Sequence, residues 1–351
     1  MTADKMLADI EREAIDAARD MGTSRVASLA RVMSVLFIYY GSEKIFASGQ
    51  EPIEACRDLL RQLRDFFEFT IRSGFPPHQH RLSPPESVGE GDIETITGTH
   101  YGRLFETFSA QSYWEEPKEL LRARLTRNEI DLTALPRQNV LDAGCGGGRY
   151  TVAWRLLGAR SVTGVDISPI NIASARRRVE EAGIDNVSFV EGNVLALPFP
   201  DASFDLVFSN GVLHHTVDWK AGIGELLRVM KPGGWGWLYL IEEPGGLYWE
   251  LIEILREIMH EEERAFARQI IRQLEIPENR IFYMLDHVMA PINQRLTPAE
   301  IEERLAAGGA IGIKRLTRGA DFDRVERIHR GEPYAQSKFG VGENRYVFAK
   351  P

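Results

Sequence analysis

The pattern of apolar positions divides the chain into two kinds of segment. In residues 4–75, apolar side chains recur every three or four positions, which is the spacing of amphipathic helices. Beyond them, short apolar runs alternate with helical patterns, which predicts a parallel sheet flanked by helices and therefore an α/β fold. The predicted strands lie at 140–141, 161–165, 187–190, 204–209, 235–241, 311–316 and 345–349.

Three helices are predicted in the N-terminal segment. Ser24 is placed to cap the second of them, and Gly41 is expected to end it. The third should begin at Pro52 and run to residue 71. Because these helices carry more apolar surface than a short segment buries alone, we expect them to pack on the rest of the chain or on a second subunit, with a homodimer favoured. The stripe on the third helix is interpreted as packing rather than as a substrate lid; it comprises Leu59, Leu60, Leu63, Phe66, Phe67 and Phe69.

Composition changes sharply between residues 76 and 98, which are rich in Pro, Gly, Ser and His and are interpreted as a linker. His78 and His80 lie there without neighbouring cysteines or a carboxylate cluster, so no metal site is predicted. Residues 99–351 are expected to form one α/β domain, interrupted after the fifth strand by a helical insertion at about 245–296. The predicted organisation is therefore 1–75 helical, 76–98 linker and 99–351 α/β.

Charge, cysteine content and the lack of long apolar runs indicate the cellular compartment and the kinds of partner to expect. The chain has 351 residues and a net charge of −9, which argues against nonspecific nucleic-acid binding. Its two cysteines form no disulfide framework. Residues 1–20 lack the apolar core of a signal peptide, and the longest apolar run, 32–40, is too short to span a bilayer. A cytoplasmic protein without membrane or nucleic-acid partners is expected.

A glycine-rich turn follows the first predicted strand and has the form D-x-G-x-G-x-G, from Asp142 to Gly148. Such a turn brings the backbone close to a ligand at the start of a helix. A dinucleotide fingerprint would need glycine where Arg149 stands. The carboxylate of Asp142 would repel a pyrophosphate, so the turn suits a ligand that carries an ammonium group.

Four further motifs follow in order. Asp166 ends the second strand about twenty residues past the turn, where an acidic side chain accepts hydrogen bonds from ribose hydroxyls, although it could instead cap the next helix. Residues 191–199 contain Glu-Gly-Asn-Val before an apolar stretch with Pro-Phe. Residues 201–215 run from Asp201 through the fourth strand to His214 and His215, and Lys-Pro-Gly-Gly at 231–234 precedes the fifth.

This series resembles the motifs of the class I S-adenosylmethionine (SAM) dependent methyltransferases, type-11 domain family. The resemblance covers 140–241 and extends to the last two strands, but not to 1–98. It implies a Rossmann-like seven-stranded sheet and SAM as cofactor. Asn193 stands where the family more often has Asp, and its carbonyl can accept the same hydrogen bond from adenine. The implied cofactor contacts are Asp142, Gly144, Cys145, Gly146, Gly148, Asp166, Ile167, Asn193, Val194 and Asn210.

Methyl transfer is an in-line displacement in which the leaving thioether needs no proton, so alignment and a base for the acceptor matter most. His214 and His215 are the candidate bases; the alternative is that they orient the loop or pack beside adenosine. Residues 100–105 and 112–114 form an aromatic segment before the first strand. In many small-molecule methyltransferases such a segment folds over the cofactor, although ordinary helix packing would equally explain these aromatic residues. The predicted acceptor contacts are Tyr101, Tyr113, His214, Arg327, Lys338 and Arg345, the last three being cations that a solvated loop would also explain.

The sequence therefore favours a SAM-dependent methyltransferase that acts on an oxygen or nitrogen of a small molecule. One alternative is a protein or RNA methyltransferase, of which the acidic charge disfavours RNA. Another is a SAM-binding regulator or scaffold without turnover.

Overall fold

The computed structural model describes residues 5–74 and 110–351, so the predicted linker and Tyr101 lie outside the described residues. It divides the chain into two units. Of the described residues, one unit contains 5–74, 244–290 and 330–341, and the other contains 110–243, 291–329 and 342–351. The helical insertion thus belongs with the N-terminal helices, whereas 291–296, expected in the insertion, belongs to the sheet unit.

The sheet unit contains the seven predicted strands in the order β3-β2-β1-β4-β5-β7-β6. Neighbouring strands among β1 to β5 are parallel, whereas β7 is antiparallel to both β5 and β6. The prediction of a parallel sheet is therefore wrong for β7, because this strand enters between β5 and β6 in the opposite direction. The strands are β1 (Asn139–Ala143), β2 (Ser161–Asp166), β3 (Val187–Glu191), β4 (Phe204–Asn210), β5 (Met230–Leu240), β6 (Ile311–Arg315) and β7 (Asn344–Ala349).

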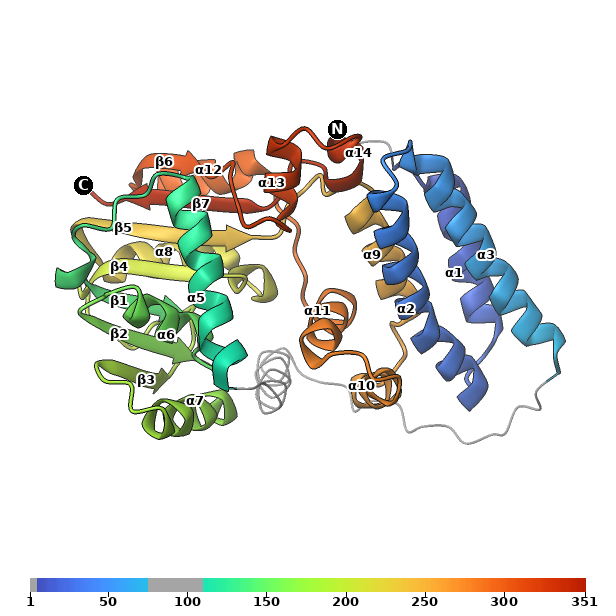
Figure 1. Cartoon of the computed structure of the whole chain (residues 1–351), viewed down its shortest axis with the longest axis horizontal. Coiled ribbons are helices and arrows are strands. Elements are labelled where there is room, and N and C mark those ends of the chain that lie inside the picture. The colour runs from blue at the N-terminus through green and yellow to red at the C-terminus, as the bar shows by residue number, and fades with distance from the viewer. Residues whose placement is uncertain (1–4, 75–109) are drawn as a thin grey trace. The chain divides into compact units, whose positions relative to one another are not determined.

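Helices cover both faces of this sheet (Figure 1). One face packs against α5 (Ala110–Arg127) and α6 (Arg149–Leu156), the other against α8 (Trp219–Val229) and α12 (Pro298–Ala307). Successive strand residues alternate between the faces, as a β-strand requires, and both sets are apolar because both faces are buried. Val140, Leu206, Phe208 and Trp237 face α5 and α6, whereas Leu141, Val207 and Leu238 face α8 and α12. Next to α6, α7 (Pro169–Glu181) packs on β3.

In the helical unit, the second helix begins after Ser24 as predicted but does not end at Gly41. Ser24 caps that helix by accepting from the Ala27 N–H at 3.1 Å. The helix continues through Gly41, where an added Cβ would lie 2.5 Å from Leu59 Cδ1. Gly41 thus permits close approach of two helices rather than ending one. The unit contains α1 (Ala8–Asp20), α2 (Arg25–Ala47), α3 (Pro52–Arg72), α9 (Gly246–Ile258), α10 (Arg264–Gln273), α11 (Glu278–Met289) and α14 (Ala335–Phe339).

Several other boundaries differ from the prediction. The insertion predicted at about 245–296 contains the helices α9, α10 and α11 and joins the helical unit only as far as residue 290. Two short helices were not predicted, α14 and α13 (Arg324–His329). Thr297 caps α12 in a capping box with Glu300.

The predicted stripe on α3 is only partly buried. Four of its six members are core residues, but Phe66 and Phe69 are 41% and 65% exposed. The homodimer that this apolar surface suggested stays a prediction. Among the described residues, no helix has both the length and the apolar character needed to cross a bilayer.

Candidate functional site

The glycine turn connects β1 to α6 through three left-handed residues. Gly144, Gly146 and Gly148 have φ values of 81°, 51° and 80°. The Gly144 and Cys145 N–H groups donate to the Val165 carbonyl at 2.8 and 2.9 Å, which fixes the turn to β2. An added Cβ at Gly144 would lie 2.4 Å from Val212 Cγ1, so glycine is required there on steric as well as conformational grounds.

Asp166 is the carboxylate that organises this turn. Its Oδ2 accepts from the Gly146 N–H at 2.8 Å, and its Oδ1 accepts from the Ser168 N–H and Asn171 Nδ2, both at 3.0 Å. Burial raises the pKa of Asp166, and these hydrogen bonds oppose the rise. With one donor at Oδ2, a lone pair remains for a ribose hydroxyl, which fits the predicted cofactor. The alternative of a helix cap does not hold, because Ser168 is the N-cap of α7.

Asp142 lies within β1, which continues to Ala143. Its side chain faces the protein interior. The side chain is 2% exposed, and its Oδ2 accepts from Thr151 Oγ1 at 2.6 Å. Burial, with a smaller contribution from the Asp166 charge, raises the pKa of Asp142 to about 7. This hydrogen bond to α6 is not predicted from the sequence, and contact of Asp142 with a ligand ammonium stays a prediction.

Cys145 contributes packing to the turn. The side chain is buried, and burial raises the pKa of its thiol well above the usual value. An added Cβ at Gly164 would lie 2.8 Å from its Sγ, so the sulfur fills the space beside β2. A contact of Cys145 with the cofactor therefore has to come from its backbone.

The segment after β3 lies next to Asp166, because the Gly192 N–H donates to the Asp166 carbonyl at 3.0 Å. Asn193 Oδ1 accepts from the Leu195 N–H at 2.8 Å, so one of its lone pairs holds the loop. The Val194 side chain belongs to the core, which leaves its backbone N–H for adenine. The adenine contacts themselves, and that of Ile167, stay predictions.

The two histidines lie in a short 3₁₀ turn after β4 (Leu213–His215), and both are buried. His215 Nδ1 lies 2.7 Å from the Ile292 carbonyl, so Nδ1 carries the proton and the lone pair of the neutral ring is on Nε2. His214 Nδ1 accepts from the Ile241 N–H at 3.3 Å, which places the proton of its neutral ring on Nε2. Of the two predicted bases, His215 therefore has the tautomer that accepts a proton at Nε2.

Tyr239, on β5, is a residue that the sequence analysis missed. It pairs in register with Asn210, whose Oδ1 accepts from Trp237 Nε1 at 3.1 Å. The Tyr239 ring lies 6.1 Å from the His214 ring, and the Arg345 guanidinium lies 4.9 Å from its centroid. Among the described residues its hydroxyl has no hydrogen-bond partner. The signal in the sequence was a single hydroxyl within an apolar strand that follows the segment 201–215.

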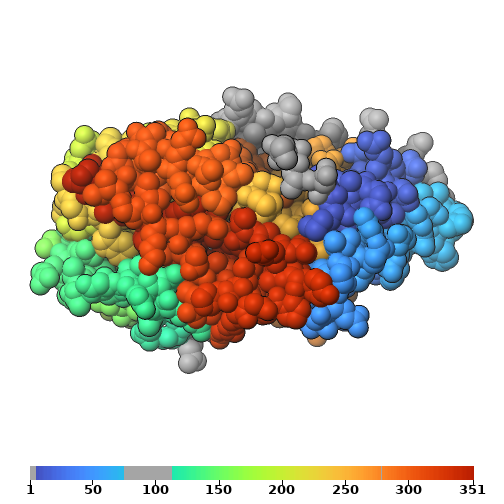
Figure 2. All heavy atoms as spheres, turned by 90° about the horizontal axis from the view of Figure 1, so that it is seen from above, coloured from blue at the N-terminus to red at the C-terminus, as the bar shows by residue number. Residues whose placement is uncertain are grey.

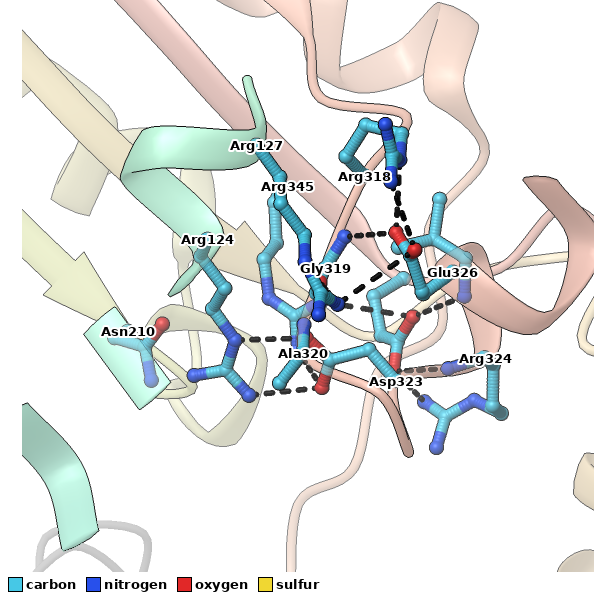
Figure 3. Close-up of polar contacts among 12 residues, drawn as sticks. Arg124, Arg127, Asn210, Arg318, Gly319, Ala320, Asp323, Arg324, Glu326 and Arg345 are labelled. Carbon is cyan, nitrogen blue, oxygen red and sulfur yellow. Dashed lines mark hydrogen bonds and ion pairs between the residues drawn. The ribbon is translucent and has the colours of Figure 1, made fainter. Parts of the chain in front are cut away.

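Arg345 lies in a buried network of charged side chains (Figure 3). Its Nη2 donates to Asp323 at 3.2 Å, and its Nη1 lies 3.6 Å from Glu343. Arg124 also donates to both oxygens of Asp323, each at 2.8 Å. Burial acts to raise the pKa of Asp323, but the charges of Arg345 and Arg124 hold it far below its usual value, so the Asp323 carboxylate is ionised. Because these carboxylates compensate Arg345, its predicted role toward an anionic acceptor is less direct than the sequence suggested.

The other predicted acceptor contacts are not brought together. Lys338 belongs to the helical unit and is 1% exposed, with its Nζ donating to the Phe46 and Pro333 carbonyls at 3.0 and 2.7 Å. Arg327 lies on α13 in the sheet unit. Tyr113 is fully buried against the glycine turn.

Comparison with known proteins gives the family of this sheet unit. Residues 141–238 match the family model described as "Methyltransferase domain". The chain is 34% identical over 143 residues to 27-O-demethylrifamycin SV methyltransferase of Amycolatopsis mediterranei, a match that covers 38% of this chain and 53% of that protein. It is 39% identical over 102 residues to demethylmenaquinone methyltransferase of Listeria welshimeri, covering 27% and 42%. The chain thus spans about half the length of the curated relatives it matches.

Among solved structures, phosphoethanolamine N-methyltransferase 2 of Haemonchus contortus, in complex with S-adenosylhomocysteine, aligns with a TM-score of 0.47 and 19% identity, covering 76% of this chain and 61% of that one. The strand order and the glycine turn agree with the family match. The cofactor of this domain is S-adenosyl-L-methionine. Residues 141–238 of this chain thus form a methyltransferase domain, with the strand order and the glycine turn expected of the class I SAM-dependent family.

Proposed function

We propose that this protein transfers the methyl group of SAM to an oxygen or nitrogen of a small-molecule acceptor by in-line displacement. The observation that carries the proposal is the tautomer of His215, which its 2.7 Å contact with the Ile292 carbonyl defines. A base near neutral pH is what a hydroxyl or ammonium acceptor requires.

The loop that bears His215 lies directly on the glycine turn. Val212 packs so closely on Gly144 that no Cβ fits between them. The carbonyl of His214, in the same loop, accepts from the Gln294 N–H at 2.9 Å, and Gln294 Nε2 donates to the Thr216 carbonyl at 2.6 Å. The loop is therefore held from both sides and can keep a base in a fixed direction.

The bound cofactor supplies a methyl group on a sulfonium. The chain would bind its ribose through Asp166 and its adenine through Asn193 and the backbone of Val194. His215 Nε2 would take the acceptor proton, and Tyr239 would orient the acceptor through its hydroxyl. Because the site is largely buried, water would be displaced from the charges that react.

The names of the relatives support a small-molecule acceptor. Rifamycin and menaquinone derivatives are small molecules, and the relatives named for them share 34% and 39% identity with this chain in the matched region. The name of the rifamycin enzyme gives an oxygen as the methylated atom. The proposed small-molecule acceptor is supported by the similarity to these two relatives and by the geometry of His215.

Turnover against a panel of acceptors tests the proposal. Purified protein and SAM are incubated with phenols, alcohols, amines, a peptide mixture and RNA, and both S-adenosylhomocysteine and methylated product are quantified by mass spectrometry. Methylation of a small-molecule oxygen or nitrogen is expected. Methylation confined to peptides or RNA would overturn it, as would calorimetry showing SAM binding with no turnover on any acceptor class.

A further inference from the structure

Tyr113, on α5, contacts the glycine turn from outside the motif. Its hydroxyl donates to the Gly147 carbonyl at 2.6 Å, and the side chain is fully buried. The Arg178 guanidinium lies 4.4 Å from the ring centroid and that of Arg149 lies 5.7 Å from it. Trp114 packs edge-on against the ring, with centroids 4.4 Å apart. The ring is therefore held from several directions and can present its hydroxyl in only one way.

The hydroxyl fixes a peptide group that would otherwise be easily rotated. The Gly147 carbonyl lies between Gly146 and Gly148, and glycines tolerate several backbone conformations at little cost. Because a peptide group is planar, fixing the Gly147 carbonyl also fixes the Gly148 N–H, which donates to the Cys145 carbonyl at 2.9 Å. Gly148 is the N-cap of α6, so the orientation of this peptide determines where the turn meets its helix.

The far end of α5 is anchored just as firmly within the sheet unit. Arg124 donates to both oxygens of Asp323, and both side chains are almost completely buried. Arg127 Nη1, labelled in Figure 3, donates to the Gly319 carbonyl at 2.6 Å, and Asn128 Nδ2 donates to the Arg318 carbonyl at 2.8 Å. At the surface, the green atoms of α5 lie against the orange-red atoms that follow β6 (Figure 2). An anchored helix gives Tyr113 a fixed base from which to hold the turn.

We propose that Tyr113 is a positioning residue for the cofactor: it sets the glycine turn in its binding conformation through the Gly147 carbonyl. The proposal rests on the cofactor role of that turn and does not depend on the acceptor. It replaces the predicted contact of Tyr113 with the acceptor by an indirect role in SAM binding.

The test compares Tyr113→Phe with Tyr346→Phe. Tyr346, on β7, is also fully buried, and its hydroxyl donates to Glu302 Oε1 at 3.1 Å, away from the turn. Calorimetry with S-adenosylhomocysteine should show binding to Tyr113→Phe weakened roughly tenfold, the ratio set by one lost hydrogen bond, and binding to Tyr346→Phe unchanged. At saturating SAM, kcat of Tyr113→Phe should stay within about twofold of wild type.

A merely structural role would lower the melting temperature of both variants and leave the affinity unchanged, which would overturn the proposal. If Tyr113→Phe does not fold, Arg178→Gln gives the same readout, since it releases one side of the ring; weaker S-adenosylhomocysteine binding is expected, and unchanged affinity would overturn the proposal. Failure of the wild type to bind S-adenosylhomocysteine would instead contradict the cofactor assignment.

Discussion

Two regions at the carboxyl edge of the sheet are built in different ways. The cofactor region, at the ends of β1 to β3, is held by short-range bonds: Asp166 binds the backbone of Gly146, twenty residues earlier, and of Ser168. The acceptor region, after β4 and β5, is held by long-range bonds. His215 binds the carbonyl of Ile292, 77 residues later, and Tyr239 lies under Arg345.

The difference shows which part of the site can change independently. The cofactor region is organised by the backbone donors that bind the Asp166 carboxylate and by Tyr113, which holds the Gly147 carbonyl from α5. The acceptor region takes its residues from segments on either side of the helical insertion, including 291–296 and the start of β7. Changes in those segments can alter the acceptor without disturbing the turn.

The largest expected effect separates the two histidines. His215→Ala should lower kcat by about 10²–10⁴-fold, the range for loss of a general base, with SAM affinity nearly unchanged. His214→Ala is the matched control and should mainly raise KM for the acceptor. Both are measured with an acceptor found in the panel. Equal, near-normal kcat in the two variants would leave alignment as the source of rate and remove the base from the mechanism.

Asp142 gives a prediction about stability and pH. Because the folded protein holds its proton up to a pKa of about 7, against 3.8 ordinarily, this group lowers the free energy of unfolding as the pH rises between those values. Asp142→Asn should remove that decline, a change on the order of 1–4 kcal/mol.

Denaturant unfolding at several pH values, for wild type and Asp142→Asn, measures the effect. Asp131→Asn is the control, because Asp131 is exposed and its pKa is lowered by Thr133. It should leave the pH dependence between about 4 and 7 unchanged. Parallel pH profiles for wild type and Asp142→Asn would show that Asp142 is ionised throughout.

Removal of the Asp166 carboxylate should weaken binding of the cofactor. Asp166→Ala should weaken SAM binding by roughly 1.5–3 kcal/mol, the range for hydrogen bonds to a charged group. The substitution also removes the acceptor of three hydrogen bonds, those from the Gly146 N–H, the Ser168 N–H and Asn171 Nδ2, so the melting temperature should fall as well. Calorimetry and thermal unfolding measure the two effects; normal SAM affinity would contradict the ribose assignment.

The smallest effect tests the acceptor region. Tyr239→Phe should raise KM for the acceptor several-fold, which corresponds to one neutral hydrogen bond of about 1 kcal/mol. SAM affinity should not change, because Tyr239 lies on β5 beside His214 and not at the glycine turn. Steady-state kinetics at varied acceptor checks this. An altered KM for SAM with normal acceptor kinetics would place Tyr239 in the cofactor region instead.

The contacts of the tyrosines and of the predicted cationic residues could not be predicted from the sequence. Tyr113 is a candidate from the sequence, but its hydrogen bond to Gly147 is not predictable, since the two residues are 34 positions apart. Arg345 and Lys338 were grouped because they are close in sequence, yet they belong to different units. Tyr239 gave only the signal of one hydroxyl within an apolar strand, which ordinary packing explains until its neighbours are known.

The sequence by itself determined the seven strands, the glycine turn and Asp166, because local patterns encode them: strand alternation, left-handed glycines and a carboxylate at a fixed distance along the chain. Only the tertiary structure decided which histidine has a lone pair on Nε2, which carboxylates compensate Arg345, and that the helical insertion joins the N-terminal helices. The physical reason is that these depend on hydrogen bonds and ion pairs between distant segments. Such contacts form only when the chain is folded.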